Sequence, residues 1–358
     1  MNKFNLKVLL SLLLVNCANI VNAAIILQYH HVSNSTPAST SISPQQFKVH
    51  LHYLKDNGFT VVPLNEIVEA IKTQQVIKDK TVAITFDDAY LDILTQAKPI
   101  LDSFNYPFTL FINPSIVSKK STHYLTWQQL KAMADNGVII ANHGFDHHAL
   151  ARVPQGQTEQ QWLQHYGKLL NKSEAIIKAK TGQSWHYFAY PYGEYSAKAK
   201  AWLTQLGFVG FSQQSGAVGL HSDLSALSRF PASQPYDQLS SLKTKLYSLP
   251  LNLTVVPPNK PLIYCYQQTT SISFKLDDNF IQQDDFHQKL LSCYITGIGK
   301  QHLVWQNQQH FTISFNQPLP IGRVRANCTV PSKSKVGRFY WHSHPWFILH
   351  ENGDWYAL

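Results

Sequence analysis

The sequence predicts an α/β fold, namely a distorted or incomplete (β/α) barrel of about seven strands followed by a small β-rich C-terminal domain. Three observations support this prediction. Short apolar segments alternate with helical segments from Ala24 to about residue 245. Polar residues follow directly after several of the apolar segments. Beyond residue 250, helical periodicity gives way to short strand-like segments that are rich in aromatic residues.

The strands of the barrel are expected at short apolar segments that are bounded by polar or turn residues. The first is IILQY at residues 25–29. Further strands are expected at residues 81–86, 108–112, 138–142, 186–190 and 208–212. Because helical segments separate these strands, the sheet should be parallel, and its functional residues should lie at the carboxyl ends of the strands.

Capping residues indicate where the helices begin and end. Residues 43–58 are predicted to form a helix, because Ser43 can cap its start and Gly58 can end it. Residues 126–137 form a second predicted helix, which begins and ends in the same way, with Thr and Gly. A long helix is expected near residues 157–181.

Composition and prolines indicate the division of the chain into domains. Apolar residues make up 44% and charged residues only 14% of the 358 residues, which is typical of a folded protein. The barrel domain is predicted at residues 24–250, and a β-rich domain of unknown role at residues 251–358. The segment VVPPNKP at 255–261 marks the boundary region.

The N-terminus has the features of a secretory signal peptide, predicted at residues 1–23. Lys3 and Lys7 provide positive charge, residues 8–15 form a short apolar core, and VNA precedes Ala24. The apolar stretch is too short to span a membrane, so no transmembrane span is expected in the mature chain. The protein is therefore expected to be periplasmic or secreted.

The four cysteines lead to two further expectations. A lipoprotein signal at Cys17 is the less favoured alternative, because Asn16 is a poor fit before a lipidated cysteine. In an oxidising compartment, two of Cys265, Cys293 and Cys328 are expected to form a disulfide and one to stay free, with the pairing left open.

The overall charge bears on the kind of partner. The formal net charge is +9, which would suit anionic polymers of a cell envelope. No long run of Lys or Arg occurs in the sequence, so nucleic acid is not expected as a partner. The sequence predicts no particular protein partner.

Four groups of polar residues lie at the ends of predicted strands. Asp87 and Asp88 follow the strand AITF, and NHGFDHH spans residues 142–148. YPYGEY spans residues 190–195, and YHHV at 29–32 ends the first strand. Because the carboxyl ends of parallel strands share one edge of the sheet, these groups are expected to surround one cleft.

One carboxylate and two imidazoles can hold a divalent transition metal and leave positions open for water and substrate. His143 and His147 are four residues apart, so a helical turn or a tight loop would bring both rings to one side. His148 remains an alternative to His147. Two adjacent carboxylates are costly without a cation. One of Asp87 and Asp88 is therefore expected to hold the metal while the other takes a proton from water.

The motifs TFDD, HGFDH and YPYG, in this order on a βα fold, resemble those of the polysaccharide deacetylase family, the NodB-homology domain of carbohydrate esterase family four. The resemblance implies that Asp87 is the general base. It implies metal ligation by Asp88, His143 and His147, and an oxyanion contact from the backbone N–H of Tyr192. Zinc is the expected ion, although other divalent first-row ions suit the same ligands.

The resemblance covers about residues 24–245. The YHHV start resembles the branch of the family that deacetylates poly-β-1,6-N-acetylglucosamine, in which the acid histidine comes from the first strand. His30 occupies that place and is the favoured general acid. His221, in the segment VGLH, remains the alternative, and His31 is expected to have a structural role.

The sequence departs from the family pattern at two positions. Gly144 stands where the family has Ser or Thr, which removes a hydroxyl and is expected to change little else. Residues 188–190 lack the arginine that many members carry there. Arg229 could replace that arginine and orient Asp87, but a surface position is the favoured interpretation of Arg229.

Aromatic residues near the motifs could line a sugar-binding groove. Trp127 is nevertheless expected to pack against the barrel. The aromatic residues near the motifs are Tyr124, Trp127, Tyr190 and Tyr192. In the segment FYWHSHPWF at 339–347, His342 and His344 could bind metal or the aromatic rings could contact sugar, but a sandwich core or domain interface is favoured.

The resemblance thus implies an exported, metal-dependent hydrolase that removes N-acetyl groups from N-acetylglucosamine-containing polysaccharide, with the poly-β-1,6 polymer preferred. A peptidoglycan or chitooligosaccharide deacetylase is one alternative. A non-catalytic, polysaccharide-binding envelope protein with the same fold is another, although it would not need both the TFDD and the HxxxH motifs. The sequence leaves the choice between N-acetyl and O-acetyl groups and the oligomeric state open.

Overall fold

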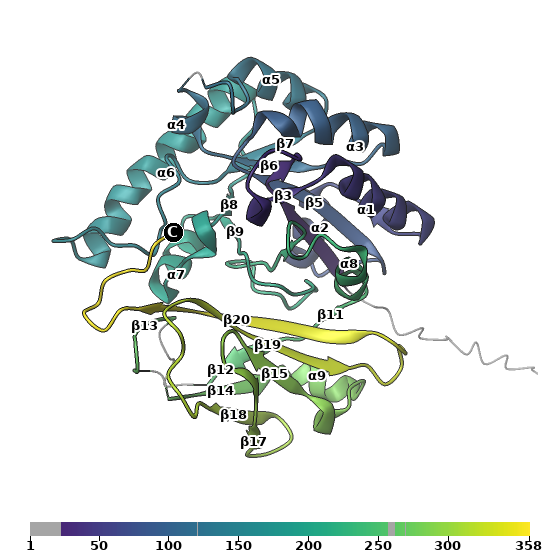
Figure 1. Cartoon of the computed structure of the whole chain (residues 1–358), viewed down its shortest axis with the longest axis vertical. Helices are drawn as coiled ribbons and strands as arrows, with labels where there is room; N and C mark the ends of the chain where they lie inside the picture. Colours follow the sequence, from purple (N-terminus) through teal and green to yellow (C-terminus); the bar gives the residue numbers. More distant parts are fainter. Residues whose placement is uncertain (1–22, 120, 257–261, 269) are drawn as a thin grey trace, which may run out of the picture.

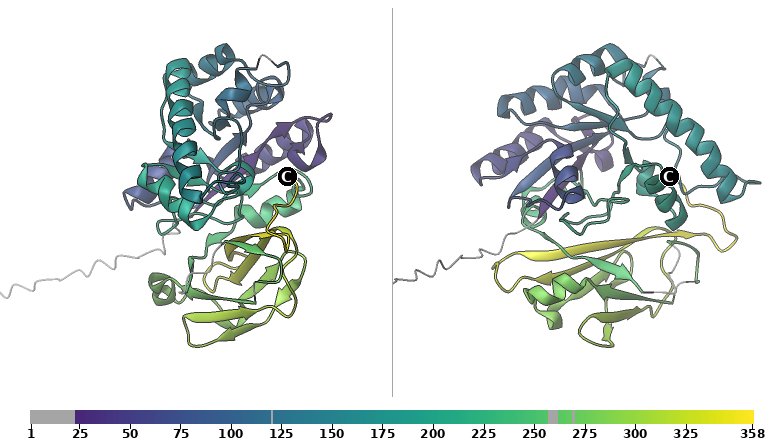
Figure 2. Two further views of the ribbon diagram at one scale, coloured as in Figure 1. Left: turned by 90° about the vertical axis from the view of Figure 1, so that its left-hand side faces the viewer. Right: turned by 180° about the vertical axis from the view of Figure 1, so that it is seen from behind.

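The computed structural model describes residues 23–119, 121–256, 262–268 and 270–358. Residues 1–22 of the predicted signal peptide, including Cys17, lie outside the described residues, as does most of the proline-rich segment 255–261. Figure 1 and Figure 2 show a larger α/β part above a smaller β-rich part, with the long strand β20 (Phe339–Leu349) running between them.

The α/β part is built on a curled, open sheet whose strands are all parallel (Figure 1). The strand order is β10-β1-β5-β6-β7-β8-β9, and β4 also pairs with β5. The strands are β1 (Ala24–Tyr29), β4 (Thr60–Val61), β5 (Thr81–Asp87), β6 (Thr109–Ile112), β7 (Ile139–Asn142), β8 (Tyr187–Ala189), β9 (Val209–Phe211) and β10 (Phe230–Pro231). The predicted incomplete barrel of about seven strands is therefore confirmed.

Helices cover the outer face of this sheet (Figure 1). Ser43 accepts a hydrogen bond from the backbone N–H of Gln46, and Thr126 forms a full capping box, as the sequence predicts. None of the described helices is both long enough and apolar enough to cross a membrane. The helices are α1 (Pro44–Asp56), α2 (Leu64–Lys72), α3 (Lys98–Phe104), α4 (Pro114–Val117), α5 (Trp127–Asp135), α6 (Glu159–Thr181), α7 (Ala197–Gln205) and α8 (Leu239–Leu246).

The central strands are buried on both faces, which explains why they read as continuous apolar segments. All seven residues of β5 are buried. Val82, Ile84 and Phe86 belong to the core under the helices. Ala83 points to the opposite side, into the core inside the barrel. Because side chains alternate along a strand, Asp87 shares this inner face with Ala83.

The C-terminal part consists of two packed sheets with a common core (Figure 1). One has the order β11-β20-β19-β15-β16, with β13 also paired to β20, and the other has the order β12-β14-β18-β17. The strands are β11 (Leu249–Pro250), β12 (Leu253–Val255), β13 (Ile263–Cys265), β14 (Ser271–Leu276), β15 (Ser292–Ile295), β16 (Gly299–Gln301), β17 (Leu303–Trp305), β18 (His310–Ser314), β19 (Gly322–Pro331) and β20; one helix, α9 (Asp278–Gln283), lies among them.

The cysteines of this part behave as predicted, with one pair and one free thiol. Cys293 on β15 and Cys328 on β19 face each other across the two strands and form a disulfide. Cys265 is free. The domain boundary predicted between residues 250 and 251 falls directly after β11, which already pairs with β20.

Strand β20 serves two cores, one on each face. Trp341 packs edge-on against Phe230 of the barrel, with the ring centroids 5.3 Å apart. His342 and His344 point the other way, and their rings lie 6.3 and 5.5 Å from that of Phe274 in the sandwich core. The segment thus forms core and interface, as favoured from the sequence. Within the described ranges, these histidines belong to no group of three metal-ligating side chains.

The burial of His344 leads to a prediction about acid stability. Burial lowers the pKa of this histidine to about 3, while the unfolded value is near 6.5. Below about pH 6.5 the unfolded chain therefore binds a proton that the folded chain does not. The free energy of unfolding should fall by up to about 1.4 kcal/mol per pH unit from this group as the pH drops towards 4.

Replacing His344 with Phe should remove this contribution. Denaturant unfolding at pH 7.5 and at pH 5 would measure it, because the loss of stability between the two values should be smaller in His344→Phe than in the wild type. Equal losses in both proteins would contradict the prediction.

Candidate active site

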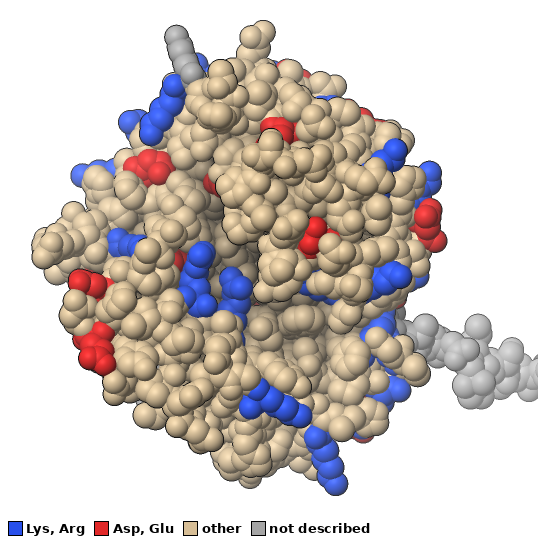
Figure 3. All heavy atoms as spheres, in the orientation of Figure 1, with Lys and Arg blue, Asp and Glu red and all other residues tan. Residues whose placement is uncertain are grey.

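The polar residues at the ends of the strands surround one cavity, of about 640 Å³. Asp87 and Asp88 lie at the end of β5, and His143 and His147 lie just after β7. Asp88 and His147 line the cavity, whereas Asp87 and His143 are fully buried. Figure 3 shows a hollow between the upper and lower parts of the molecule, with Lys and Arg side chains along its lower rim.

Asp88, His143 and His147 form a compact triangle. Asp88 Oδ1 lies 3.5 Å from His143 Nε2 and 3.4 Å from His147 Nε2. The two Nε2 atoms are 3.2 Å apart. In the described part of the chain, this is the group of three metal-ligating side chains whose ligand atoms lie within 4.8 Å of one another. The structure thus brings the three predicted ligands together.

The size of this triangle fits a divalent ion. Tetrahedral Zn²⁺ binds nitrogen and carboxylate oxygen at about 2.0–2.2 Å, which places neighbouring ligand atoms about 3.3–3.5 Å apart. The three sides of the triangle, 3.2, 3.4 and 3.5 Å, match that spacing closely. Two imidazoles and one carboxylate are also the donor types that suit zinc and other divalent first-row ions.

The two histidines are held in the form that binds metal. His143 Nδ1 lies 2.8 Å from the carbonyl oxygen of Ala189 on β8, to which it can donate, so that Nε2 is left as the lone-pair nitrogen. Burial lowers the pKa of His143 to about 3 and the pKa of His147 to about 4, so both are neutral at pH 7. His148 instead is mostly exposed and pairs with Asp146 at 2.9 Å, which favours His147 over His148.

Asp88 occupies a position that a cation would stabilise. Burial raises the pKa of Asp88 to about 6, and the negative charge of Asp87 adds to the rise. A second carboxylate nearby makes the ionised form of such a carboxyl group costly, and a bound cation lowers that cost. This electrostatic argument and the spacing of the ligands point to the same kind of occupant.

Asp87 is clamped by a buried arginine. Arg229 donates from Nη1 to Asp87 Oδ1 at 2.7 Å and from Nη2 to Oδ2 at 2.9 Å, and both side chains are fully buried. Gln28 Nε2 adds a bond of 2.7 Å. Burial alone would raise the pKa of Asp87, but the charge of Arg229 and its hydrogen bonds outweigh burial and hold the pKa well below its usual range.

The favoured interpretation of Arg229 as a surface residue is therefore wrong. Arg229 immediately precedes β10, which pairs with β1 beside β5, and this topology carries a residue 142 positions away to Asp87. A lone arginine before a two-residue strand gave little indication of burial. The absence of an arginine at residues 188–190 was the only indication in the sequence that another arginine contacts Asp87.

His30 lies at the cavity, close to Asp87. Its Nε2 is 3.8 Å from Asp87 Oδ2, and its side chain lines the cavity. His221 is exposed and follows Val218, which pairs with Ala24 at the amino end of β1. His30 follows the opposite end, about 20 Å away along the strand. The structure thus brings His30, and not His221, to the cavity.

His31 has the structural role expected of it. Its Nδ1 lies 2.6 Å from Asp92 Oδ2, and its ring stacks on Tyr90 with the centroids 3.6 Å apart. Asp92 Oδ1 also accepts a bond from the backbone N–H of Val32. These contacts fix the loop that carries His30.

Several site residues have a strained backbone. Asp88, Ala89, His147 and Tyr192 all have φ between 57° and 75°, in the left-handed region that non-glycine residues rarely adopt. Such conformations cost about 1–3 kcal/mol each and concentrate at functional sites. The strain turns Asp88 and His147 towards a common point, and the ring of Tyr192 packs on that of His147 at 4.4 Å.

Gly144 matters more than the sequence suggested. Its φ is +82°, and a Cβ at this position would lie 2.8 Å from the hydroxyl oxygen of Tyr166. That hydroxyl donates to the carbonyl oxygen of His148 at 3.1 Å. A Ser or Thr would not fit here, because the Tyr166 hydroxyl already occupies the space and supports the loop of His147.

The aromatic residues divide into two groups. Tyr124 and Tyr192 line the cavity, as expected. The suggestion that Tyr190 lines a groove is wrong, because it is fully buried and donates to the carbonyl oxygen of Ser225 at 2.8 Å. Trp127 packs against the barrel core, as expected. Tyr90 lines the cavity and was not anticipated.

The C-terminal domain also contributes to the cavity, which the sequence did not indicate. Arg323 and Arg325 of β19 are among its lining residues. Arg323 Nη1 donates to the carbonyl oxygen of Tyr192 at 3.2 Å. These arginines lie more than 100 residues beyond the motifs, and no local pattern distinguishes them from other polar residues on a strand.

Comparisons with known proteins show which family and which folds this chain resembles. The sequence model of the polysaccharide deacetylase family matches residues 74–211. The Bacillus subtilis (strain 168) protein YxkH, whose name suggests a polysaccharide deacetylase, is 28% identical over 209 residues, which cover 58% of this chain and 71% of that protein. A poly-β-1,6-N-acetyl-D-glucosamine N-deacetylase of Escherichia coli K12 is 21% identical over 245 residues, 58% of this chain but only 36% of that longer protein.

Solved structures share the fold. The Streptococcus pyogenes deacetylase PplD, in complex with acetate, superposes with a TM-score of 0.56 and 22% identity, covering 63% of this chain and 99% of that chain. IcaB from Ammonifex degensii gives a TM-score of 0.56 and 24% identity, covering 63% of this chain and 97% of that one. The match to the family model, the curled sheet and the three strand-end motifs thus coincide in the α/β part of this chain, which is similar to the polysaccharide deacetylase family.

Proposed function

We propose that this chain is an exported, metal-dependent hydrolase that removes N-acetyl groups from N-acetylglucosamine polysaccharide, with poly-β-1,6-N-acetylglucosamine as the preferred polymer. The observation that carries the proposal is the triangle of Asp88, His143 and His147, sized for a divalent ion, with Asp87 clamped beside it. The names of the E. coli and Staphylococcus relatives support the choice of polymer. The predicted signal peptide supports export.

Asp88, His143 and His147 would hold the ion, with zinc as the favoured metal. Such an ion would act as a Lewis acid, which lowers the pKa of water and polarises a carbonyl oxygen. Asp87 cannot join the ligands easily, because both its oxygens accept hydrogen bonds from Arg229. It therefore stays available as a carboxylate that accepts a proton from the attacking water.

His30 and Tyr192 complete the proposed machinery. His30 lies 3.8 Å from Asp87 and faces the cavity, where it can protonate the nitrogen that leaves the acetyl group. Tyr192 sits in a strained turn at the cavity wall, where its backbone N–H can donate to the developing oxyanion. The products would be acetate and a glucosamine residue in the polymer.

A peptidoglycan or chitooligosaccharide substrate would need the same chemistry and remains the alternative within the enzyme class. A non-catalytic polysaccharide binder is less well supported, because binding alone does not require a fully buried arginine to orient a carboxylate beside the ligand triangle. The experiments below separate catalysis from binding.

Metal content tests the ligand assignment. The purified protein, after exposure to zinc and removal of free ions, should contain about one divalent ion per chain by elemental analysis. His143→Ala should lose that ion, because it removes a ligand in the triangle. His148→Ala is the matched control and should keep the ion, since His148 points to Asp146. Equal loss in both variants would contradict the assignment.

Replacement of the proposed base tests the chemistry. Asp87→Asn should lower kcat for acetate release from acetylated glucosamine oligomers by at least about a hundredfold, because the proton acceptor is lost. Its metal content should stay close to that of the wild type. Asp135→Asn, an exposed change on α5, serves as the control. Full activity of Asp87→Asn would refute the proposed role.

The clamp on Asp87 has a measurable energy. Arg229→Gln should lower the free energy of unfolding by about 3–5 kcal/mol, because it leaves a buried carboxylate without its counterion. The double variant Arg229→Gln with Asp87→Asn should recover part of that loss, since the uncompensated charge is gone. Denaturant unfolding measures both. A double variant that is no more stable than Arg229→Gln would show that the pair does not act as described.

A further inference from the structure

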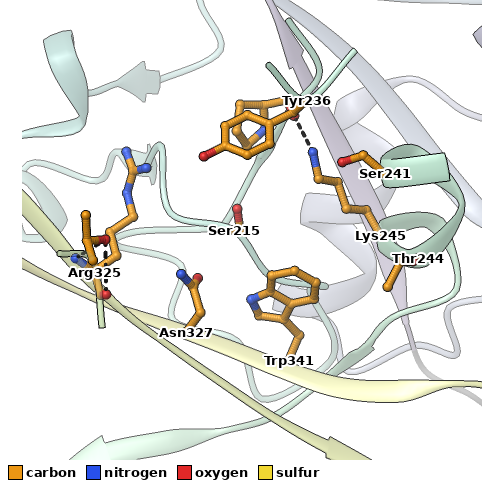
Figure 4. A pocket seen from close by; sticks show the side chains of 10 residues that line it. Ser215, Tyr236, Ser241, Thr244, Lys245, Arg325, Asn327 and Trp341 are labelled. Atoms are coloured by element: carbon orange, nitrogen blue, oxygen red, sulfur yellow. Dashed lines mark hydrogen bonds between the residues drawn. The ribbon is translucent and has the colours of Figure 1, made fainter. Parts of the chain in front are cut away.

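A second cavity, of about 300 Å³, adjoins the candidate active site. The two cavities share Pro231, Tyr236 and Arg325 in their walls. Figure 4 shows that helix α8 of the barrel provides Ser241 and Lys245 on one side, while Arg325 and Asn327 come from the C-terminal sheet on the other. The cavity is thus built by both parts of the chain and continues the active-site cavity along their boundary.

The side chains of β19 that face this boundary follow the alternation of the strand. Val324, Ala326 and Cys328 are buried in the sandwich core. Arg325 and Asn327 therefore point the other way, towards the barrel, and both line the second cavity. The placement of a basic residue here is fixed by the register of the strand and is not a chance orientation of a surface side chain.

Lys245 is a buried cation on the opposite wall. Only 5% of it is exposed, and its Nζ donates to the carbonyl oxygen of Pro231 at 2.8 Å. Nζ also lies 4.6 Å from the centroid of the Tyr236 ring. Burial lowers the pKa of Lys245 to about 8. The ammonium group therefore has a neutral acceptor and an aromatic face but lacks a negative partner in the described structure.

Arg325, like Lys245, lacks a negatively charged partner in the described structure. Its Nε is buried and has no hydrogen-bond partner among the described residues. Burial lowers the pKa of Arg325 below its usual value, and the next largest effect is repulsion from Arg323, which acts in the same direction. A guanidinium group with an unused donor beside another guanidinium group is poorly compensated.

Among the described residues, three of the other four arginines pair with a carboxylate, whereas Arg323, like Arg325, does not. Arg152 pairs with Glu194, Arg229 with Asp87 and Arg338 with Asp79, each at 2.7–2.9 Å. Within the described ranges, no carboxylate lies within 4.0 Å of a side-chain nitrogen of Arg325 or Lys245. Two partly or fully buried cations on facing walls of one cavity call for an anionic ligand between them.

The rest of the lining suits a sugar. Trp341 and Tyr236 offer aromatic surface, and Asn327, Ser241 and Thr244 offer polar groups that can hydrogen-bond to hydroxyls (Figure 4). The Trp341 indole N–H already donates to Ser343, so its ring face is the part left for a ligand. Aromatic faces with a few polar groups are typical of carbohydrate sites, whereas a site for a free inorganic ion would need no aromatic wall.

We propose that this second cavity is a subsite for an acidic sugar residue, whose carboxylate or phosphate group binds between Arg325 and Lys245. The residue would belong to the same polymer chain whose N-acetyl group lies at Asp88, His143 and His147, because the two cavities share a wall. The proposal rests on the proposed deacetylase function but changes the preferred polymer: it favours an N-acetylglucosamine polysaccharide that also carries acidic residues over the neutral poly-β-1,6 homopolymer, and the C-terminal domain selects it.

The test measures binding directly, so that it does not depend on turnover. Isothermal titration calorimetry at 0.15 M salt would compare three probes on the zinc-loaded protein: N-acetylglucosamine oligomers, the same oligomers carrying carboxymethyl groups, and the phosphorylated oligomers. The wild type should bind the carboxymethylated or phosphorylated oligomers at least about tenfold more tightly than the neutral ones, since a hydrogen bond to a charged group contributes about that factor.

Variants of the cavity residues test whether the preference for anionic oligomers arises in the second cavity. Arg325→Gln should bring the ratio of the two affinities to about one, and Lys245→Gln should reduce it. Lys243→Gln is the matched control, because Lys243 is exposed on the same helix and does not line the cavity, and it should keep the wild-type ratio. If Lys245→Gln does not fold because Lys245 is buried, Arg325→Gln alone decides the question.

Three results would overturn the proposal. One is equal affinity of the wild type for neutral and anionic oligomers. Another is a preference that survives in Arg325→Gln. Inorganic phosphate that competes as strongly as the phosphorylated oligomer would also reject a sugar subsite in favour of a simple anion site. Acetate release, measured separately, distinguishes failure of the deacetylase proposal from failure of the subsite, because the affinity ratio does not require hydrolysis.

Discussion

The site depends above all on one buried ion pair, between Arg229 and Asp87. Two carboxylates side by side at the end of β5, one of them fully buried, would repel each other. Arg229 neutralises one of them with two hydrogen bonds and so separates their roles: Asp87 stays ionised and fixed, and Asp88 is left to face His143 and His147. Because such a pair gains little net stability over an apolar pair, its presence at the centre of the barrel points to chemistry more than to folding.

The fold delivers the rest of the site through strand ends and strained turns. Strands β1, β5, β7 and β8 run parallel in one sheet, so the residues that follow them converge at one edge. The chain then leaves regular geometry at Asp88, His147 and Tyr192, where positive φ values redirect side chains or backbone into the cavity. Neighbouring contacts hold these turns in place, as when the hydroxyl of Tyr166 fills the space beside Gly144.

The sequence predicted features that depend on neighbouring residues and missed contacts between segments that are far apart in the chain. Apolar segments and capping residues located the barrel strands and the main helices, for example α1 after Ser43, and motif spacing located the ligand triangle. The position of Arg229 depends on the pairing of β10 with β1, and that of Arg325 on the register of β19. Such pairings between segments far apart leave no mark in local composition, so Arg229 could be raised only as the less favoured partner of Asp87, and the second cavity could not be foreseen.

The two-sided packing of β20 has a consequence for how this chain can change. Side chains on one face of this strand pack against the barrel, as Trp341 does, and side chains on the other face pack in the sandwich core, as His344 does. Insertion or deletion of a single residue in this strand would exchange the two sets and expose aromatic surface on both sides at once. Changes in β20 are therefore limited to substitutions. Neither the barrel nor the sandwich could be exchanged by recombination unless the new part packed on the same face of β20.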